Sequence, residues 1–168
     1  MPRFVPVVLT LMVMFFAACG SDDSTSGAPQ GSGSGDHGMD MGGEQFAFGE
    51  PGDRSEADRT VDVSALDALE FDPDSLTVEA GETISFVVTN DGKNLHEFVL
   101  GDESYQQEHA AEMSEDEHME IGPNQIQVEP GETETLTWTF TEAGEVLYGC
   151  HEPGHYEGGM VGAIEVGS

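Results

Sequence analysis

A single cysteine lies in a short C-terminal segment that also carries a histidine and a methionine. In YGCHEPGHYEGGM, the final residues of the chain before its last apolar stretch, Cys150 is followed by His155 and then by Met160. Their side chains offer a thiolate, an imidazole and a thioether, which are donors for soft and borderline metal ions. Pro153 and three glycines separate them, so the loop could curve back around one point. The spacing therefore predicts a metal site.

The only other cysteine is Cys19, which ends an N-terminal apolar segment preceded by Arg3. The small–small–Cys ending of this segment is typical of the lipobox of bacterial lipoproteins. We therefore expect a signal peptide at 1–18, lipid attachment at Cys19, and residence at the outer face of the cytoplasmic membrane or in the periplasm. Simple cleavage nearby is the alternative. Cys150 then has no disulfide partner, so it is either buried and inert or bound to a metal.

The charge balance is strongly acidic. The sequence has 34 acidic and four basic residues, with a formal net charge of −30. Such a surface repels nucleic acid and favours basic partner proteins. It also favours a monomer, although adaptation to salt or solubility explains most of the acids.

The composition changes near residue 60. Residues 19–60 are rich in Gly, Ser, Asp and Glu without periodicity, which predicts a flexible acidic tether. Beyond it, TISFVVTN (83–90) and TLTWTFT (135–141) alternate as half-buried strands do. Shorter strands are expected at 67–71, 75–79, 95–100, 125–129, 144–149 and 161–166. Many short strands separated by turn signals predict an all-β sandwich at 61–168.

One inserted segment, at about 102–122, breaks the strand pattern. Ser104 and Gln107 could form a capping box, and a helix is expected from about 105 to 113. His109 and Met113 are four residues apart and would share one helix face. Imidazole and thioether donors suit Cu(I), so with His118 and Met119 they could form a weaker copper site, second to the one at Cys150, the alternative being a solvated acidic helix.

A second group of soft donors lies in the tether. His37, Met39 and Met41 occur within DHGMDMGG. They could capture copper loosely, or the segment could be a plain linker.

His96 is the best candidate for a further ligand, because it begins an expected strand directly after a polar turn. With Cys150, His155 and Met160 it completes a set of two imidazoles, one thiolate and a weak thioether. This set indicates one type 1 copper ion, whereas zinc prefers a closed tetrahedral set without thioether. His151 should point away from the metal, toward the surface or the surroundings of the site.

NLHEFVL and YGCHEPGHYEGGM resemble the two copper-ligand segments of the cupredoxins, the family of plastocyanin and pseudoazurin. The resemblance covers roughly residues 65–168 and implies a Greek-key β-sandwich with His96, Cys150, His155 and Met160 as ligands in that order. The gap between cysteine and histidine is longer than in plastocyanin. Glu97 replaces an Asn whose side chain, in many cupredoxins, ties the two ligand segments together.

The donor set and the resemblance imply a one-electron carrier outside the cytoplasmic membrane, with a redox partner that is basic at its docking face. The chain shows no second redox centre for enzymatic turnover. The alternative is copper homeostasis or tolerance, because the inserted segment resembles that of small periplasmic cupredoxins linked with copper tolerance.

Overall fold

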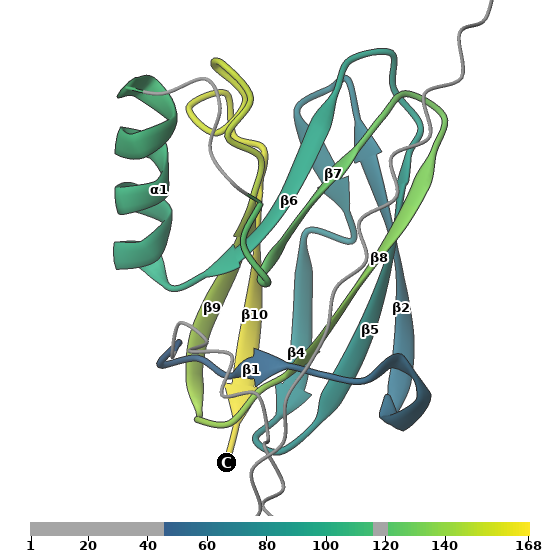
Figure 1. Ribbon diagram of the computed structural model, residues 1–168, viewed down its shortest axis with the longest axis vertical. Helices are drawn as coiled ribbons and strands as arrows, with labels where there is room; N and C mark the ends of the chain where they lie inside the picture. Colours follow the sequence, from purple (N-terminus) through teal and green to yellow (C-terminus); the bar gives the residue numbers. More distant parts are fainter. Residues whose placement is uncertain (1–45, 116–120) are drawn as a thin grey trace, which may run out of the picture. The chain divides into compact units, whose positions relative to one another are not determined.

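Two five-stranded sheets form a β-sandwich in the computed structural model, which describes residues 46–115 and 121–168 (Figure 1). The first sheet contains, in spatial order, β1 (Glu50–Pro51), β8 (Thr133–Thr139), β5 (Thr83–Asn90), β2 (Arg59–Leu66) and β3 (Glu70–Asp72). The second contains β4 (Ser75–Glu79), β10 (Val161–Gly167), β9 (Gly144–Gly149), β6 (His96–Gly101) and β7 (Gln125–Val128). The pairs β2–β5 and β4–β10 are parallel, and the other pairs are antiparallel. The expected all-β sandwich with a short inserted helix is confirmed.

Large apolar side chains from both sheets fill the space between them. Trp138 of β8 and Phe86 of β5 are fully buried, as the alternation of their strands predicts, and Phe98 of β6 is fully buried as well. Tyr148 of β9 is also fully buried, and its hydroxyl donates a hydrogen bond to the Pro73 carbonyl at 2.7 Å. The core therefore continues along β9 to the residue that precedes Gly149 and Cys150.

The β-sandwich includes residues that we had placed before it. Residues 46–60, which we assigned to the tether, include β1, a 3₁₀ turn (Arg54–Glu56) and the start of β2. Phe48 stacks on Trp138 with ring centroids 5.4 Å apart, so this segment covers one edge of the core. We also missed β2, whose Val61 and Val63 point inward between exposed polar neighbours. In place of the strand expected at 67–71, the shorter strand β3 begins only after a turn.

The inserted helix α1 (Glu103–Glu115) contacts β6 and β9 of the second sheet (Figure 1). It begins earlier than we expected, because the Asp102 carboxylate, and not Ser104, caps it by accepting the Tyr105 N–H at 2.8 Å. Close packing at the end of β9 also depends on Gly149, because a Cβ added there would lie only 2.6 Å from the Tyr156 ring. Among the described residues, no helix combines the length and apolarity needed to span a bilayer.

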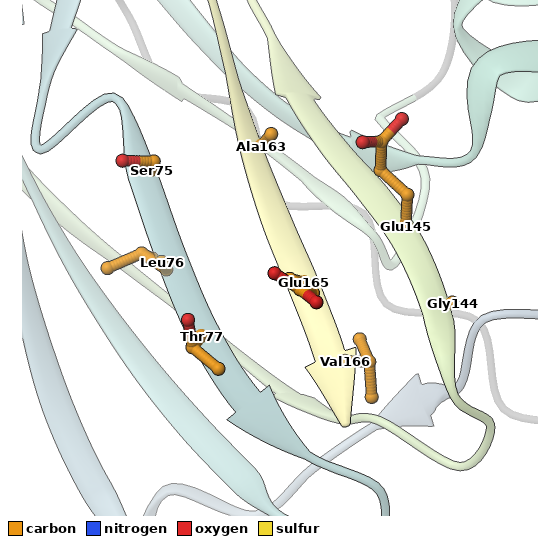
Figure 2. A pocket seen from close by; sticks show the side chains of 8 residues that line it. All are labelled: Ser75, Leu76, Thr77, Gly144, Glu145, Ala163, Glu165 and Val166. Carbon is orange, nitrogen blue, oxygen red and sulfur yellow. The ribbon is translucent and has the colours of Figure 1, made fainter. Parts of the chain in front are cut away.

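The outer face of β4, β9 and β10 is polar and carries an open hollow, lined in part by Ser75, Thr77, Glu145 and Glu165 (Figure 2). Glu145 and Glu165 lie directly opposite each other on the paired strands β9 and β10. Like charges in this position destabilise a sheet. The hollow offers no histidine, cysteine or methionine, so we place no metal site there.

Replacing Glu165 with lysine should stabilise the fold, because it turns this repulsive pair into an attractive one. We expect Glu165→Lys to raise the free energy of unfolding by about 0.2–1 kcal/mol more than the control Glu134→Lys does. Glu134 is also exposed, but it lies opposite Val88, so the control makes the same change in net charge without relieving a pair. Urea unfolding at low salt measures both variants, and equal stabilisation would contradict the prediction.

Candidate metal centre

Two neighbouring strands bring the ligand segments together. His96 opens β6, Cys150 directly follows β9, and these antiparallel strands pair through Val99 and Gly149. The loop from 150 to 160 then closes on itself by backbone hydrogen bonds. Cys150 N–H donates to the Met160 carbonyl at 3.1 Å, and Met160 N–H donates to the His155 carbonyl at 3.0 Å. These bonds hold the start of β10 beside the cysteine.

Three donor atoms converge at the centre of this arrangement. The Cys150 Sγ lies 3.3 Å from His155 Nδ1 and 3.9 Å from His96 Nδ1, and the three atoms lie within 4.8 Å of one another. A metal bound about 2.0 Å from nitrogen and 2.3 Å from sulfur, with angles near 110–120°, places N and S about 3.5–3.7 Å apart. The observed separations bracket this value, so the site fits a single metal ion without rearrangement of the chain.

Met160, the fourth expected ligand, is fully buried at the end of the same loop. His96 and Cys150 are also fully buried, whereas His155 is partly exposed. The centre is therefore closed toward the core, with the imidazole of His155 as its accessible edge.

The Cys150 sulfur is buried beside few compensating groups. Burial raises the pKa of this thiol to about 11. The backbone N–H of Glu97 donates to the sulfur at 3.3 Å and partly offsets this effect. Burial also lowers the pKa of His96 below its usual value, which keeps the imidazole neutral and able to bind a metal.

Glu97 occupies the position at which many cupredoxins have an Asn, and the structure explains how this replacement is accommodated. Its backbone N–H, and not its side chain, connects the first ligand segment to Cys150. The Glu97 carboxylate is buried elsewhere and accepts a hydrogen bond from Gln127 Nε2 at 3.1 Å. A backbone donor does not depend on the identity of the side chain, so an acidic residue is tolerated here.

Two residues that sequence reasoning missed hold the turn before His96. Asn90 is fully buried, and its amide donates to the carbonyls of Asn94 at 2.7 Å and Val128 at 2.8 Å. Asp67 accepts hydrogen bonds from the backbone N–H groups of Lys93 and Asn94, which lower the pKa of its carboxyl group. No chemical motif marks either residue in the sequence.

Asp67 also lies 3.6 Å from the Nε2 of His96, the nitrogen that faces away from the sulfur. This separation exceeds hydrogen-bond distance, and His96 Nε2 has no hydrogen-bond partner among the described residues, so Asp67 acts on His96 through its negative charge and through the turn that it holds.

His151 turns away from the three donors and is buried in the surroundings of the site, which is one of the two positions that we expected for it. Its Nε2 lies 2.6 Å from Gln106 Oε1, and its ring stacks on Tyr156. His109 of α1 is buried against it, so this helix is not simply a solvated one. The other members of the expected second clusters, which are His118, Met119, His37, Met39 and Met41, lie outside the described residues.

Copper affinity should depend on pH through Cys150. The thiol stays protonated at neutral pH in the metal-free protein, because its pKa is about 11, and binding as a thiolate must release this proton. Affinity should therefore rise about tenfold per unit between about pH 7.5 and 9.5. Competition titration with a chelator of known pH dependence measures the slope. A flat profile would show that the thiol is already ionised or is not a ligand.

Removal of the Asp67 carboxylate should weaken metal binding. We expect Asp67→Ala to lower copper affinity about 10–100-fold, because the turn before His96 loses its hydrogen-bond acceptor and the imidazole loses a nearby negative charge. Asp62→Ala is the matched control, since Asp62 is an exposed acid on the adjoining β2 strand. Equal affinities for the two variants in a competition titration would refute this role.

Comparison with known proteins agrees with this geometry. Residues 57–167 match the family described as copper binding proteins, plastocyanin/azurin family. The copper-resistant cuproprotein CopI of Pseudomonas aeruginosa is 38% identical, with 71% of this chain and 82% of that protein covered. CopI of Rubrivivax gelatinosus is 42% identical, with 71% and 73% covered. The chloroplastic plastocyanin of Chlamydomonas reinhardtii is 38% identical, with 66% and 68% covered.

Solved structures show the same fold. Auracyanin A, a "blue" copper protein from Chloroflexus aurantiacus, has a TM-score of 0.54 and 29% identity, with 64% of this chain and 97% of that chain covered. Auracyanin B superposes with a TM-score of 0.61 at 24% identity, with 72% and 97% covered. The CopI relatives and auracyanin A are named as copper proteins. The chain belongs to the plastocyanin/azurin family of copper-binding proteins and is a cupredoxin similar to the CopI cuproproteins.

Proposed function

We propose that His96, Cys150, His155 and Met160 bind one type 1 copper ion. The convergence of two Nδ1 atoms on one buried sulfur supports the first three ligands. Support for Met160 as the fourth ligand, a weakly bound thioether, is its complete burial and its backbone hydrogen bonds to Cys150 and His155.

We infer that the main role of this site is copper resistance in the cell envelope. The observation that carries this inference is the similarity to three CopI proteins, 35–42% identical over 71–78% of this chain, all named as copper-resistant cuproproteins. The buried thiol suits such a role, because copper bound there is shielded from water and from other thiols. The second candidate is one-electron carriage, which the similarity to a plastocyanin favours.

The residues around the metal suit both roles. Bound copper supplies one-electron exchange between Cu(II) and Cu(I). The Glu97 N–H and the loop hydrogen bonds fix the sulfur, while Asp67 faces the outer nitrogen of His96. A site held this firmly changes little when the metal changes its oxidation state. The partly exposed His155 provides the edge through which copper or an electron would pass.

We also propose that the protein is exported. The apolar N-terminal segment and Cys19 would place the domain outside the cytoplasmic membrane, attached by lipid and separated from it by the acidic tether. If the protein carries electrons, its net charge of −30 favours a partner that is basic at the docking face. Association with such a partner would slow as salt increases.

Copper tolerance of the host tests the main role. In a strain that lacks the gene, the wild-type chain and the control Glu134→Gln should restore growth on copper. Cys150→Ser should not, because it removes the sulfur on which both histidines converge. The purified Cys150→Ser protein should also lose the intense thiolate-to-copper absorption.

Full tolerance with Cys150→Ser would exclude a resistance role for this site. Unchanged copper tolerance in the deletion strain, together with impaired electron transport, would favour the carrier.

A further inference from the structure

A second group of buried polar side chains lies between α1 and the loop that follows β9. The rings of His109 and His151 meet edge to face, with centroids 4.8 Å apart, and the two residues are only 2% and 7% exposed. His109 Nε2 is inaccessible to solvent and has no hydrogen-bond partner among the described residues. An unpaired buried nitrogen is unfavourable, and a metal ion bound to its lone pair would remove this cost.

Hydrogen bonds fix the protonation of His151. The Gln106 side-chain amide donates to the Val99 carbonyl at 2.8 Å and to the Leu147 carbonyl at 3.3 Å. Its oxygen must therefore accept, and it lies 2.6 Å from His151 Nε2. This nitrogen carries the hydrogen, which leaves the lone pair on Nδ1.

Two further donors belong to the same region. The Oε2 atom of Glu97 is buried without a hydrogen-bond partner, in a side chain that is 5% exposed. Met113 follows His109 by four residues, so both lie on one face of α1. Met113 and His151 line the same pocket, together with Leu95 and Gly154. Leu95, His151 and Gly154 directly adjoin His96, Cys150 and His155 in the sequence, so the pocket flanks the type 1 site.

We propose that this region is a second copper site, which binds Cu(I) through His109 Nε2 and the Met113 thioether, with Glu97 and His151 beside them. Among the described residues, only His96, Cys150 and His155 bring three histidine, cysteine or acidic donors within 4.8 Å. The second region is therefore not preformed for zinc or Cu(II), whereas Cu(I) accepts few ligands and favours thioethers.

This site differs from the cluster expected from the sequence, since it joins α1 to β6 and the ligand loop and does not require His118 or Met119. It goes beyond the proposed function, because it holds whether or not the chain confers copper resistance. A Cu(I) ion here would be cargo held on the flank of the type 1 centre.

Silver titration of the copper-loaded protein tests the site, because Ag(I) is a redox-inert analogue of Cu(I). The exported full-length chain is first loaded with one Cu(II), and Ag(I) uptake is then measured by equilibrium dialysis and metal analysis. We expect His109→Leu and Met113→Leu each to lose one Ag(I) equivalent or to bind it at least tenfold more weakly. Glu108→Gln, an exposed acid next to His109, is the control and should behave as wild type.

The comparison of variants separates Ag(I) binding in this region from Ag(I) binding by histidines and methionines elsewhere in the chain. Every variant retains the tether and residues 116–120, so differences in uptake report only on the pocket. Unchanged type 1 absorption in all variants shows that the fold and the first site are intact. Metal-free His109→Leu should melt no lower than wild type, because it removes an unpaired nitrogen, but it should lose the rise in Tm on adding Ag(I).

Equal Ag(I) uptake in all four proteins would overturn the proposal. If a variant fails to fold, ¹⁵N NMR of the histidine rings in the wild-type protein decides, since Ag(I) should shift His109 Nε2, and an unmoved signal also overturns it. Neither result depends on copper tolerance in the host, so this proposal and the proposed function can fail separately.

Discussion

The Cys150 sulfur lies where β6, β9 and the loop before β10 meet, and the structure depends on how its burial is compensated. A buried thiolate without a positive partner is strongly unfavourable. The backbone N–H groups of Glu97 and Glu152 and two imidazole nitrogens face the sulfur in this protein. These neutral groups cannot compensate a full negative charge, but a copper ion between them can. The geometry of the loop is therefore best explained as the geometry of a metal site.

Both sheets contribute to the position of these donors. His96 and Cys150 belong to the second sheet, but the turn that leads into His96 is held by residues of the first. Asn90 ends β5, and Asp67 follows β2. Their side chains form hydrogen bonds with the backbone between residues 90 and 95. The sandwich thus acts as one rigid support, and a change in sheet packing would be transmitted to His96.

The sequence was sufficient for the features that depend on donor type and spacing. Cys150, His155 and His96 could be predicted because few residue types bind copper, and their loops end strands of clear periodicity. Asp67 and Asn90 could not, because their contacts form across 26 or more residues or within an irregular turn. The β2 strand was missed because we assigned the segment before it to the tether, although Val61, Val63 and Ala65 carry the correct period.

The inserted helix is joined to the ligand loop by polar contacts, which distinguishes it from a surface appendage. Gln106 bridges β6, β9 and His151, the residue directly after the ligand Cys150. Gly149 leaves the space into which Gln106 and Tyr156 fit. Because α1 covers this flank, the metal remains accessible mainly along the edge of His155. An insertion that only extended the surface would require neither the glycine nor a buried glutamine, so the helix and the copper loop form one structural unit.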